Sequence, residues 1–273
     1  MHDSQSMEEA VRCIIREQGR VVVLTGAGIS AESGIPTFRG PEGYWTVGST
    51  EYRPEEMATH AMFLRNPDDV WQWYLYRLGV CRAAEPNDGH RAVVAMEEEL
   101  GDRFTLITQN VDGLHLRAGS SPERTYQIHG NIDFMRCAGE CCRELFPLPD
   151  AVSVKSKGDS LADEDRAALR CPRCGGRSRP HVLWFDECYD EEHFRFESSI
   201  RVAAEADLLL SVGTSGATNL PMQVGHIASS RGALLVDVNP NRNPFAQMAE
   251  SAGGFFCEGA SGEWLPRILE LLR

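Results

Sequence analysis

The feature that most constrains the fold is an apolar run followed directly by a glycine-rich loop. The run is Val21–Leu24, and the loop Gly26–Ala31 fits the pattern G-x-G-x-x-G/A. A short β-branched run between turn signals predicts a buried strand of a parallel sheet. Glycines after such a strand let a diphosphate approach the backbone. The motif alone is weak, since a tight strand-to-helix turn that binds nothing has the same pattern.

Strand and helix patterns alternate along the rest of the chain. We expect strands at 104–108, 125–128, 181–184, 208–212 and 234–238, and helices at 7–17, 89–100, 197–206, 221–230 and 263–272. The alternation predicts an α/β fold with a Rossmann-like, doubly wound parallel sheet. A redox-type nucleotide fold also needs an acidic residue about 20 residues after the glycines, at the end of a second strand. Residues 44–49 contain no clear strand, which argues against a redox cofactor.

Composition excludes several classes of protein. The chain has 273 residues, a net charge of −13 and a pI of about 5.1, which argues against broad contact with nucleic acid phosphates. No apolar run approaches the roughly 18–20 residues that span a bilayer, and the N-terminal residues show no signal-peptide core. We therefore expect a cytoplasmic protein that binds neither membranes nor nucleic acid, with a monomer as the default oligomeric state.

Nine cysteines are many for such a chain, and five of them cluster. Cys171 and Cys174 form a C-x-x-C pair followed by two glycines, and Cys137 pairs upstream with either Cys141 or Cys142. Four thiolates from two turns suit tetrahedral zinc and leave no open position, so the ion would be structural. A redox pair or unrelated thiols are the alternatives. We expect one zinc ion on Cys137, Cys141, Cys171 and Cys174, with Cys142 as the alternative to Cys141.

Two segments break the strand–helix alternation. One is helical and aromatic-rich (54–82), and the other holds the cysteine cluster (134–180). We expect them to pack together as a smaller inserted helical and zinc-binding domain. The predicted limits are 1–45, 88–133 and 181–273 for the nucleotide-binding domain, and 46–87 and 134–180 for the small domain.

Polar residues follow several predicted strands, where α/β proteins build their sites. They occur in TQNVDGLH (108–115), in IHG (128–130), in VGTS (212–215) and at Asn239. Together with TGAGISAESGIPTFRG (25–40), the paired cysteines and VDVN (236–239), these motifs resemble the sirtuin family of NAD-dependent protein lysine deacylases. The resemblance covers nearly the whole chain. In that family NAD is consumed rather than reduced, which agrees with the missing redox-type strand.

The resemblance implies how NAD is held. Gly26, Ala27 and Gly28 would contact the pyrophosphate, whose charge Arg39 offsets, and Phe38 would cover the nicotinamide. Gln109 would contact the ribose, and Asn110 and Asp112 would bind near the carboxamide. The adenosine half would be held by Gly213, Thr214, Ser215, Asn239 and Ser261.

His129 would be the general base. The substrate amide oxygen attacks the ribose as nicotinamide leaves, His129 takes a proton from the ribose hydroxyls, and the products are free lysine and O-acyl-ADP-ribose. Imidazole suits this role because its pKa lies near working pH. Transfer of ADP-ribose to protein, NAD hydrolysis and a non-catalytic NAD sensor are the alternative functions.

Tyr74 and Arg77 are three residues apart in an expected helix and so share a face. By pattern alone they are a packed tyrosine and a snorkelling arginine. Tyr-x-x-Arg here also resembles the signature of sirtuins that remove succinyl, malonyl and glutaryl groups. In that case Arg77 would bind the acyl carboxylate with help from Tyr74, and Ala58 would leave room for the acyl chain.

The segment HVLWFDE (181–187) resembles the family's peptide-binding segment, so Val182, Trp184 and Phe185 are the expected contacts of an acylated-lysine protein or peptide. The family usually has glycine where this chain has Asp186. Asp186 adds a charge and removes backbone freedom at this position.

Overall fold

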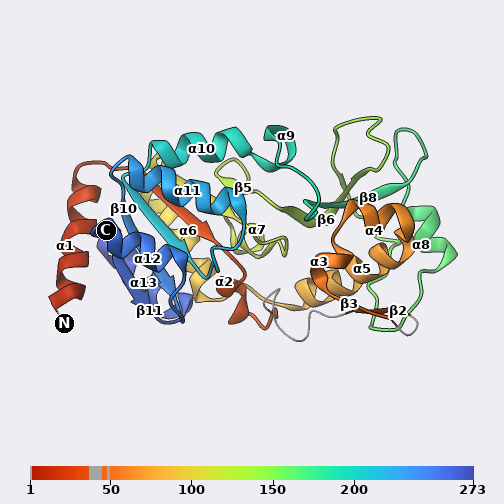
Figure 1. Cartoon of the computed structure of the whole chain (residues 1–273), viewed down its shortest axis with the longest axis horizontal. Coiled ribbons are helices and arrows are strands. Elements are labelled where there is room, and N and C mark those ends of the chain that lie inside the picture. The colour runs from red at the N-terminus through yellow and green to blue at the C-terminus, as the bar shows by residue number, and fades with distance from the viewer. Residues whose placement is uncertain (1, 37–44, 48–49) are drawn as a thin grey trace.

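The computed structural model describes residues 2–36, 45–47 and 50–273, and the molecule has a larger and a smaller lobe (Figure 1). The larger lobe is built on a six-stranded parallel sheet with the order β11-β10-β9-β1-β4-β5. Its strands are β1 (Val21–Thr25), β4 (Phe104–Thr108), β5 (Thr125–Gln127), β9 (Leu208–Val212), β10 (Leu234–Asn239) and β11 (Phe255–Glu258).

The first apolar run forms the centre of this sheet. Strand β1 pairs in parallel with β4 and β9, and all five of its residues are buried. The next strand of the sheet along the chain is β4, because β2 (Trp45–Val47) and β3 (Thr50–Tyr52) pair only with each other in the described chain. These two short strands, at and just after residues 44–49, therefore do not belong to the main sheet.

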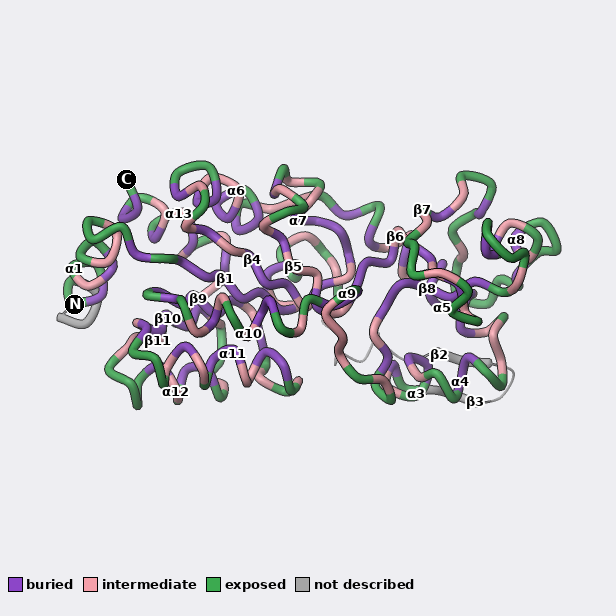
Figure 2. Tube along the Cα trace, turned by 90° about the horizontal axis from the view of Figure 1, so that it is seen from above, coloured by how far each residue is buried: buried purple, intermediate pink, exposed green. Residues whose placement is uncertain are grey.

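Helices cover both faces of the sheet (Figure 2). On one face lie α1 (His2–Arg16), α6 (Asp88–Leu100) and α13 (Ser261–Leu272), and on the other lie α10 (Phe196–Ala204), α11 (Asn219–Ser230) and α12 (Pro244–Ser251). Each face has its own apolar core, the first including Val11 and Ile268 and the second including Val224 and Phe245. The doubly wound α/β architecture predicted from the sequence is confirmed.

The smaller lobe joins segments that are far apart in the sequence. It contains α3 (Pro54–Met57), α4 (His60–Arg65), α5 (Pro67–Ala83) and α8 (Asp163–Ala168), beside a three-stranded antiparallel sheet of order β7-β6-β8. These strands are β6 (Gly130–Cys137), β7 (Phe146–Pro147) and β8 (Ser178–Val182). A third core, which includes Met57, Trp73, Met135 and Trp184, holds them together. The predicted domain limits at 133/134 and 180/181 fall inside β6 and β8, and the exact division remains a prediction.

Several elements differ from the sequence-based expectations, among them β2, which lies within residues 44–49, and α12, which no sequence pattern predicted. The strand expected at 181–184 is β8, which pairs antiparallel with β6 instead of joining the parallel sheet. Strand β6 was not expected, because its sequence GNIDFMRC mixes polar and apolar residues and buries Asn131. Strand β11 was missed because it is only four residues long and lies at the edge of the sheet.

Four short helical elements complete the described part of the chain, namely α2 (Gly28–Ala31), η2 (Gly101–Arg103), α7 (Leu114–Ala118) and α9 (Glu191–Phe194). Within the described residues, no helix has the length and apolar character needed to cross a membrane.

Candidate active site

The glycine-rich loop after β1 packs directly on the loop after β9. The Gly28 N–H donates to the Gly213 carbonyl at 2.8 Å, and a Cβ on Gly28 would lie 2.6 Å from the Gly213 Cα. Gly213 has a φ of +61°. A side chain there would be strained and would also meet the Ile29 nitrogen at 2.5 Å. The glycines are therefore required for contact between the two loops, a reason that the sequence did not reveal.

Asn110 and Asp112 lie beneath this loop and are joined through Ser30. The Asn110 amide donates to the Gly26 carbonyl at 3.1 Å and to Ser30 Oγ at 3.0 Å, and Ser30 Oγ donates to Asp112 Oδ2 at 2.7 Å. Burial raises the pKa of Asp112, while hydrogen bonds from Leu114 and Ser30 oppose the rise. Sequence reasoning missed Ser30, although it stands inside the quoted glycine motif.

Gln109 connects the loops expected to bind the two halves of NAD. Its side-chain nitrogen donates to Thr214 Oγ1 at 2.9 Å, and its side-chain oxygen accepts from Thr218 Oγ1 at 2.9 Å. Asn239, at the end of β10, donates to the Thr214 carbonyl at 2.9 Å. The carboxyl ends of β1, β4, β9 and β10 are thus brought together, as expected.

The remaining residues expected at the NAD site differ in their surroundings and in how far they are buried. Ala27 is the N-cap residue of α2, which is only four residues long. Ser215 is exposed, whereas Ser261 is buried and donates to Glu32 Oε2 at 2.8 Å. Phe38 and Arg39 lie outside the described residues.

His129 follows β5 and is only partly accessible. Its Nδ1 lies 3.0 Å from the Gln109 carbonyl oxygen, and its Nε2 lies 2.8 Å from the Tyr189 hydroxyl. Burial lowers the pKa of His129 to about 4, while the Gln109 carbonyl opposes this shift. The ring is therefore neutral at working pH and has one nitrogen able to accept a proton. Sequence reasoning missed Tyr189, which lies four residues beyond Phe185.

The cysteine cluster has the geometry of a metal centre. The Sγ atoms of Cys137, Cys141, Cys171 and Cys174 all lie within 4.8 Å of one another. The distances of 3.7 Å from Cys137 to Cys174 and 3.6 Å from Cys141 to Cys171 match the roughly 3.8 Å between thiolates around tetrahedral zinc. Cys142 lies outside this group of four. The tight turn at Gly175, with a φ of +69°, closes the second pair.

The segment expected to bind peptide lies against the helical insert. The Phe185 N–H donates to the Ala58 carbonyl at 2.9 Å. Val182 and Trp184 are buried in the core of the small lobe, whereas Phe185 is 51% exposed. Of the three expected peptide contacts, Phe185 is thus the one whose side chain is open to solvent.

Tyr74 and Arg77 lie one turn apart on α5. Tyr74 is buried, and its hydroxyl accepts a hydrogen bond from Trp184 Nε1 at 3.0 Å. Burial raises the pKa of Tyr74, and the charge of Arg77 partly offsets this rise. The Arg77 guanidinium lies over the ring of Trp73, 5.2 Å from its centroid, and its charge also opposes the rise that burial causes in the pKa of Asp112. Ala58, Tyr74 and Trp184 share one apolar cluster.

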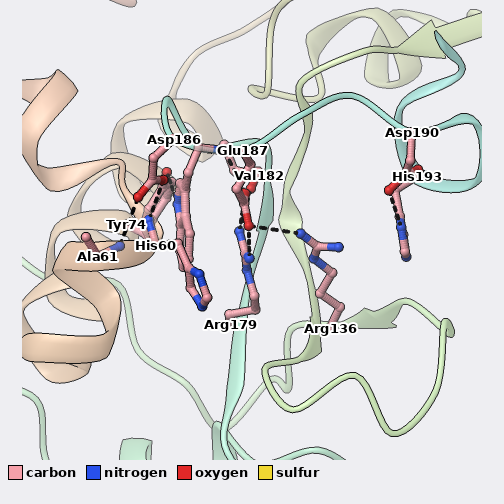
Figure 3. A network of polar contacts seen from close by, with 11 residues as sticks. His60, Ala61, Tyr74, Arg136, Arg179, Val182, Asp186, Glu187, Asp190 and His193 are labelled. Carbon is pink, nitrogen blue, oxygen red and sulfur yellow. Dashed lines mark hydrogen bonds and ion pairs between the residues drawn. The ribbon is translucent and has the colours of Figure 1, made fainter.

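Asp186 and Glu187 hold in place the segment that is expected to bind peptide (Figure 3). Asp186 accepts from the backbone N–H groups of His60 and Ala61, at 2.7 and 3.0 Å, so its carboxylate caps the first turn of α4. Glu187 accepts from Arg179 and from the Trp184 N–H, the latter at 3.0 Å. The charge that departs from the family pattern is therefore used inside the molecule, to join two segments of the small lobe.

The Glu187 contacts extend into a stack of charged and aromatic groups. The Arg179 guanidinium lies 3.4 Å from the centroid of the Trp184 ring, and Arg136 lies 3.8 Å from Glu187. Although burial raises the pKa of Glu187, its hydrogen bond with Arg179 brings the pKa below the ordinary value. Trp184 in turn donates to Tyr74. This stack therefore connects the segment expected to bind peptide to the helix that carries Arg77.

Comparison with known proteins identifies the family. The model of the Sir2 family matches residues 26–219. NAD-dependent protein deacylases of Leptospira interrogans and Thermus thermophilus are 40% and 42% identical over 252 and 248 residues, covering 92% and 90% of this chain and 92% and 88% of theirs. A solved Sir2 homologue in complex with NAD superposes with a TM-score of 0.80 at 31% identity, covering 98% of this chain and 93% of that one. The chain therefore belongs to the Sir2 (sirtuin) family and is an NAD-dependent protein deacylase that transfers the acyl group to ADP-ribose.

Proposed function

We propose that this deacylase prefers acyl groups that end in a carboxylate, such as succinyl and malonyl, and that Arg77 binds that carboxylate. The observation that supports this most is the place of Arg77 on α5. It lies one turn from Tyr74, which belongs to the Ala58–Trp184 cluster, and its charge also opposes the rise in the pKa of Asp112, beneath the glycine loop. A cation between the peptide-binding segment and the nicotinamide side suits an acyl chain that enters from the first and reacts at the second.

Tyr74 has a more limited part in this proposal than the sequence suggested. Its hydroxyl already accepts from Trp184 Nε1, so its own hydrogen remains the group that it can offer to an acyl carboxylate. The raised pKa keeps this phenol protonated at working pH. We assign the dominant interaction to Arg77, because hydrogen bonds to charged groups contribute about 1.5–3 kcal/mol.

On the NAD side, we propose that His129 is the general base. The substrate amide oxygen attacks the ribose C1′ as nicotinamide leaves, and His129 takes a proton from the ribose hydroxyls. The 2′ oxygen then attacks the resulting imidate, and water releases free lysine. The neutral ring with an accepting Nε2 supports this role.

The other sites follow the same division. Gln109, Asn110 and Asp112 would hold the nicotinamide riboside, Gly26, Ala27 and Gly28 the pyrophosphate, and Gly213, Thr214, Ser215, Asn239 and Ser261 the adenosine. An acylated peptide would lie along the segment of Val182, Trp184 and Phe185, adding as a strand. We also place the protein in the cytoplasm, where its nine cysteines, which form no disulfide in the described structure, would stay reduced.

The test of acyl preference compares kcat/KM on succinyl-lysine and acetyl-lysine versions of one peptide. We expect wild type to favour succinyl by roughly 10–150-fold, and Arg77→Met to remove most of this preference while retaining acetyl hydrolysis. Arg82→Met is the matched control. It removes a charge from the same helix, but this charge pairs with Asp133. A preference for acetyl that Arg77→Met does not change would refute the proposal.

A separate test addresses the base. His129→Ala should fold and bind NAD, yet lose deacylation by roughly 10²–10⁴-fold. Isothermal titration with NAD and product analysis by mass spectrometry give the two readouts. Near-full activity in this variant would remove His129 from the role.

A further inference from the structure

The nitrogen of His129 that must accept the proton is already occupied in this structure. A carbonyl oxygen can only accept, so the contact between Nδ1 and the Gln109 carbonyl requires the hydrogen to be on Nδ1. In the neutral ring, Nε2 then carries the lone pair. The group that faces this lone pair at 2.8 Å is the hydroxyl of Tyr189.

Tyr189 is built to act as a donor here. Burial raises the pKa of its phenol to about 12, so it keeps its hydrogen at working pH. Its ring packs on Phe196, at 6.4 Å between centroids, and lies 5.8 Å from the centroid of the His129 ring. Among the described residues, Tyr189 is the titratable group that is hydrogen-bonded to His129, and Gln109 contributes only its backbone carbonyl.

Resting on the proposed role of His129 as general base, we propose that Tyr189 is a positioning residue for it. Its hydroxyl holds His129 as the neutral, Nδ1-protonated tautomer while NAD is absent. When NAD binds, a ribose hydroxyl takes the place of the phenol as the donor to Nε2. Both hydrogen bonds are of the same kind, so His129 passes from one donor to the other without changing its tautomer or its charge.

The exchange has two consequences that a purely structural tyrosine would not produce. Loss of the phenol removes a hydrogen bond made only to the neutral ring, so the pKa of His129 should rise. It also frees Nε2 in advance, so NAD no longer has to displace a donor. The chemical step after NAD has bound should change little, because the phenol has already left Nε2 at that stage.

The first experiment measures His129 directly, by NMR of the full chain labelled with ¹⁵N-histidine, with the signals assigned through His129→Asn. Wild type should show the Nδ1-protonated tautomer and a pKa below the ordinary value of about 6.5. Tyr189→Phe should raise this pKa by roughly 0.5–1 unit. Tyr126→Phe is the matched control, because its ring lies beside Arg195, at 5.8 Å from the guanidinium carbon, and His129 should be unchanged. Equal pKa values in wild type and Tyr189→Phe would overturn the proposal.

The second experiment measures deacylation over pH with NAD varied. Tyr189→Phe should lower the KM for NAD by roughly 2–10-fold, leave kcat within about 2-fold, and move the acid limb of kcat/KM to higher pH. A fall in kcat with an unchanged KM and acid limb would contradict the proposal. The NMR result does not depend on turnover, so a failure of His129 as the base remains distinguishable from a failure of the Tyr189 contact.

Discussion

The NAD side and the proposed substrate side of the active site are held together by different kinds of interaction. On the NAD side, glycine backbones touch across two strand ends, and neutral amides and hydroxyls such as Asn110, Ser30 and Gln109 connect the loops. On the proposed substrate side, a carboxylate, two arginines and two aromatic rings hold the segment proposed to bind peptide against α5. The first arrangement depends on close approach, and the second on burying charges together. Changes of shape should therefore damage the NAD side, and changes of charge should damage the substrate side.

Removing zinc should have the largest effect, and it should fall on the small lobe and so on the substrate side. A structural zinc site contributes on the order of 10 kcal/mol to folding, and the four thiolates of this one lie only in the small lobe. Chelation should unfold the small lobe and abolish deacylation. Elemental analysis should first find one tightly held zinc per chain. Loss of the metal with retained near-UV circular dichroism and activity would contradict this assignment.

The next largest effect tests how much the charged groups on the substrate side stabilise the small lobe. Glu187→Ala leaves Arg179 and Arg136 without their shared carboxylate, and breaking a buried ion pair in this way costs about 3–5 kcal/mol. Urea denaturation should show the loss of stability. Glu263→Ala is the control, because it removes an exposed i,i+4 pair with Arg267 and should cost well under about 1 kcal/mol. Equal losses in the two variants would mean that the stack does not stabilise the lobe.

A change of shape should act on the NAD side. Gly213→Ala places a Cβ against the backbone of Gly28 and Ile29 and forces alanine into the left-handed region. Overpacking and the backbone strain together cost about 2–5 kcal/mol, and NAD binding measured by titration calorimetry should be lost. Gly232→Ala is matched for positive φ, at +89°, but has no atom within 4 Å of the added Cβ. If both variants bind NAD alike, the close approach has no importance for the site.

The smallest expected effect concerns the departure from the family pattern. Asp186→Ala removes the carboxylate that caps α4, and lost caps cost about 0.5–2 kcal/mol. KM for the peptide should rise more than KM for NAD, since α4 lies beside the peptide-binding segment. Asp150→Ala removes an exposed aspartate of the same lobe and should change neither value. An unchanged melting temperature in Asp186→Ala would show that the carboxylate does not stabilise the helix.

This difference between the two sides also explains what the sequence could predict. Strand ends with glycines and polar residues predicted the α/β fold and brought Gln109, Asn110 and Asp112 to the correct edge of the sheet, because parallel strands all end there. Spacing likewise predicted the zinc site, although it left Cys142 as an alternative to Cys141, which the structure places in the cluster. The Asp186 cap, the stack of Arg179 on Trp184 and the contact of Tyr189 with His129 join segments 60 or more residues apart, or depend on side-chain direction. No local pattern encodes such contacts.

The most direct test of the account is a competition between two acyl groups in one reaction. Equal concentrations of succinyl-lysine and acetyl-lysine peptides are mixed with NAD and the wild-type protein, and mass spectrometry measures the initial ratio of O-succinyl-ADP-ribose to O-acetyl-ADP-ribose. This ratio equals the ratio of the two kcat/KM values. The account predicts an excess of the succinyl product of roughly 10–150-fold, which collapses in Arg77→Met. A predominance of the acetyl product in both proteins would contradict it.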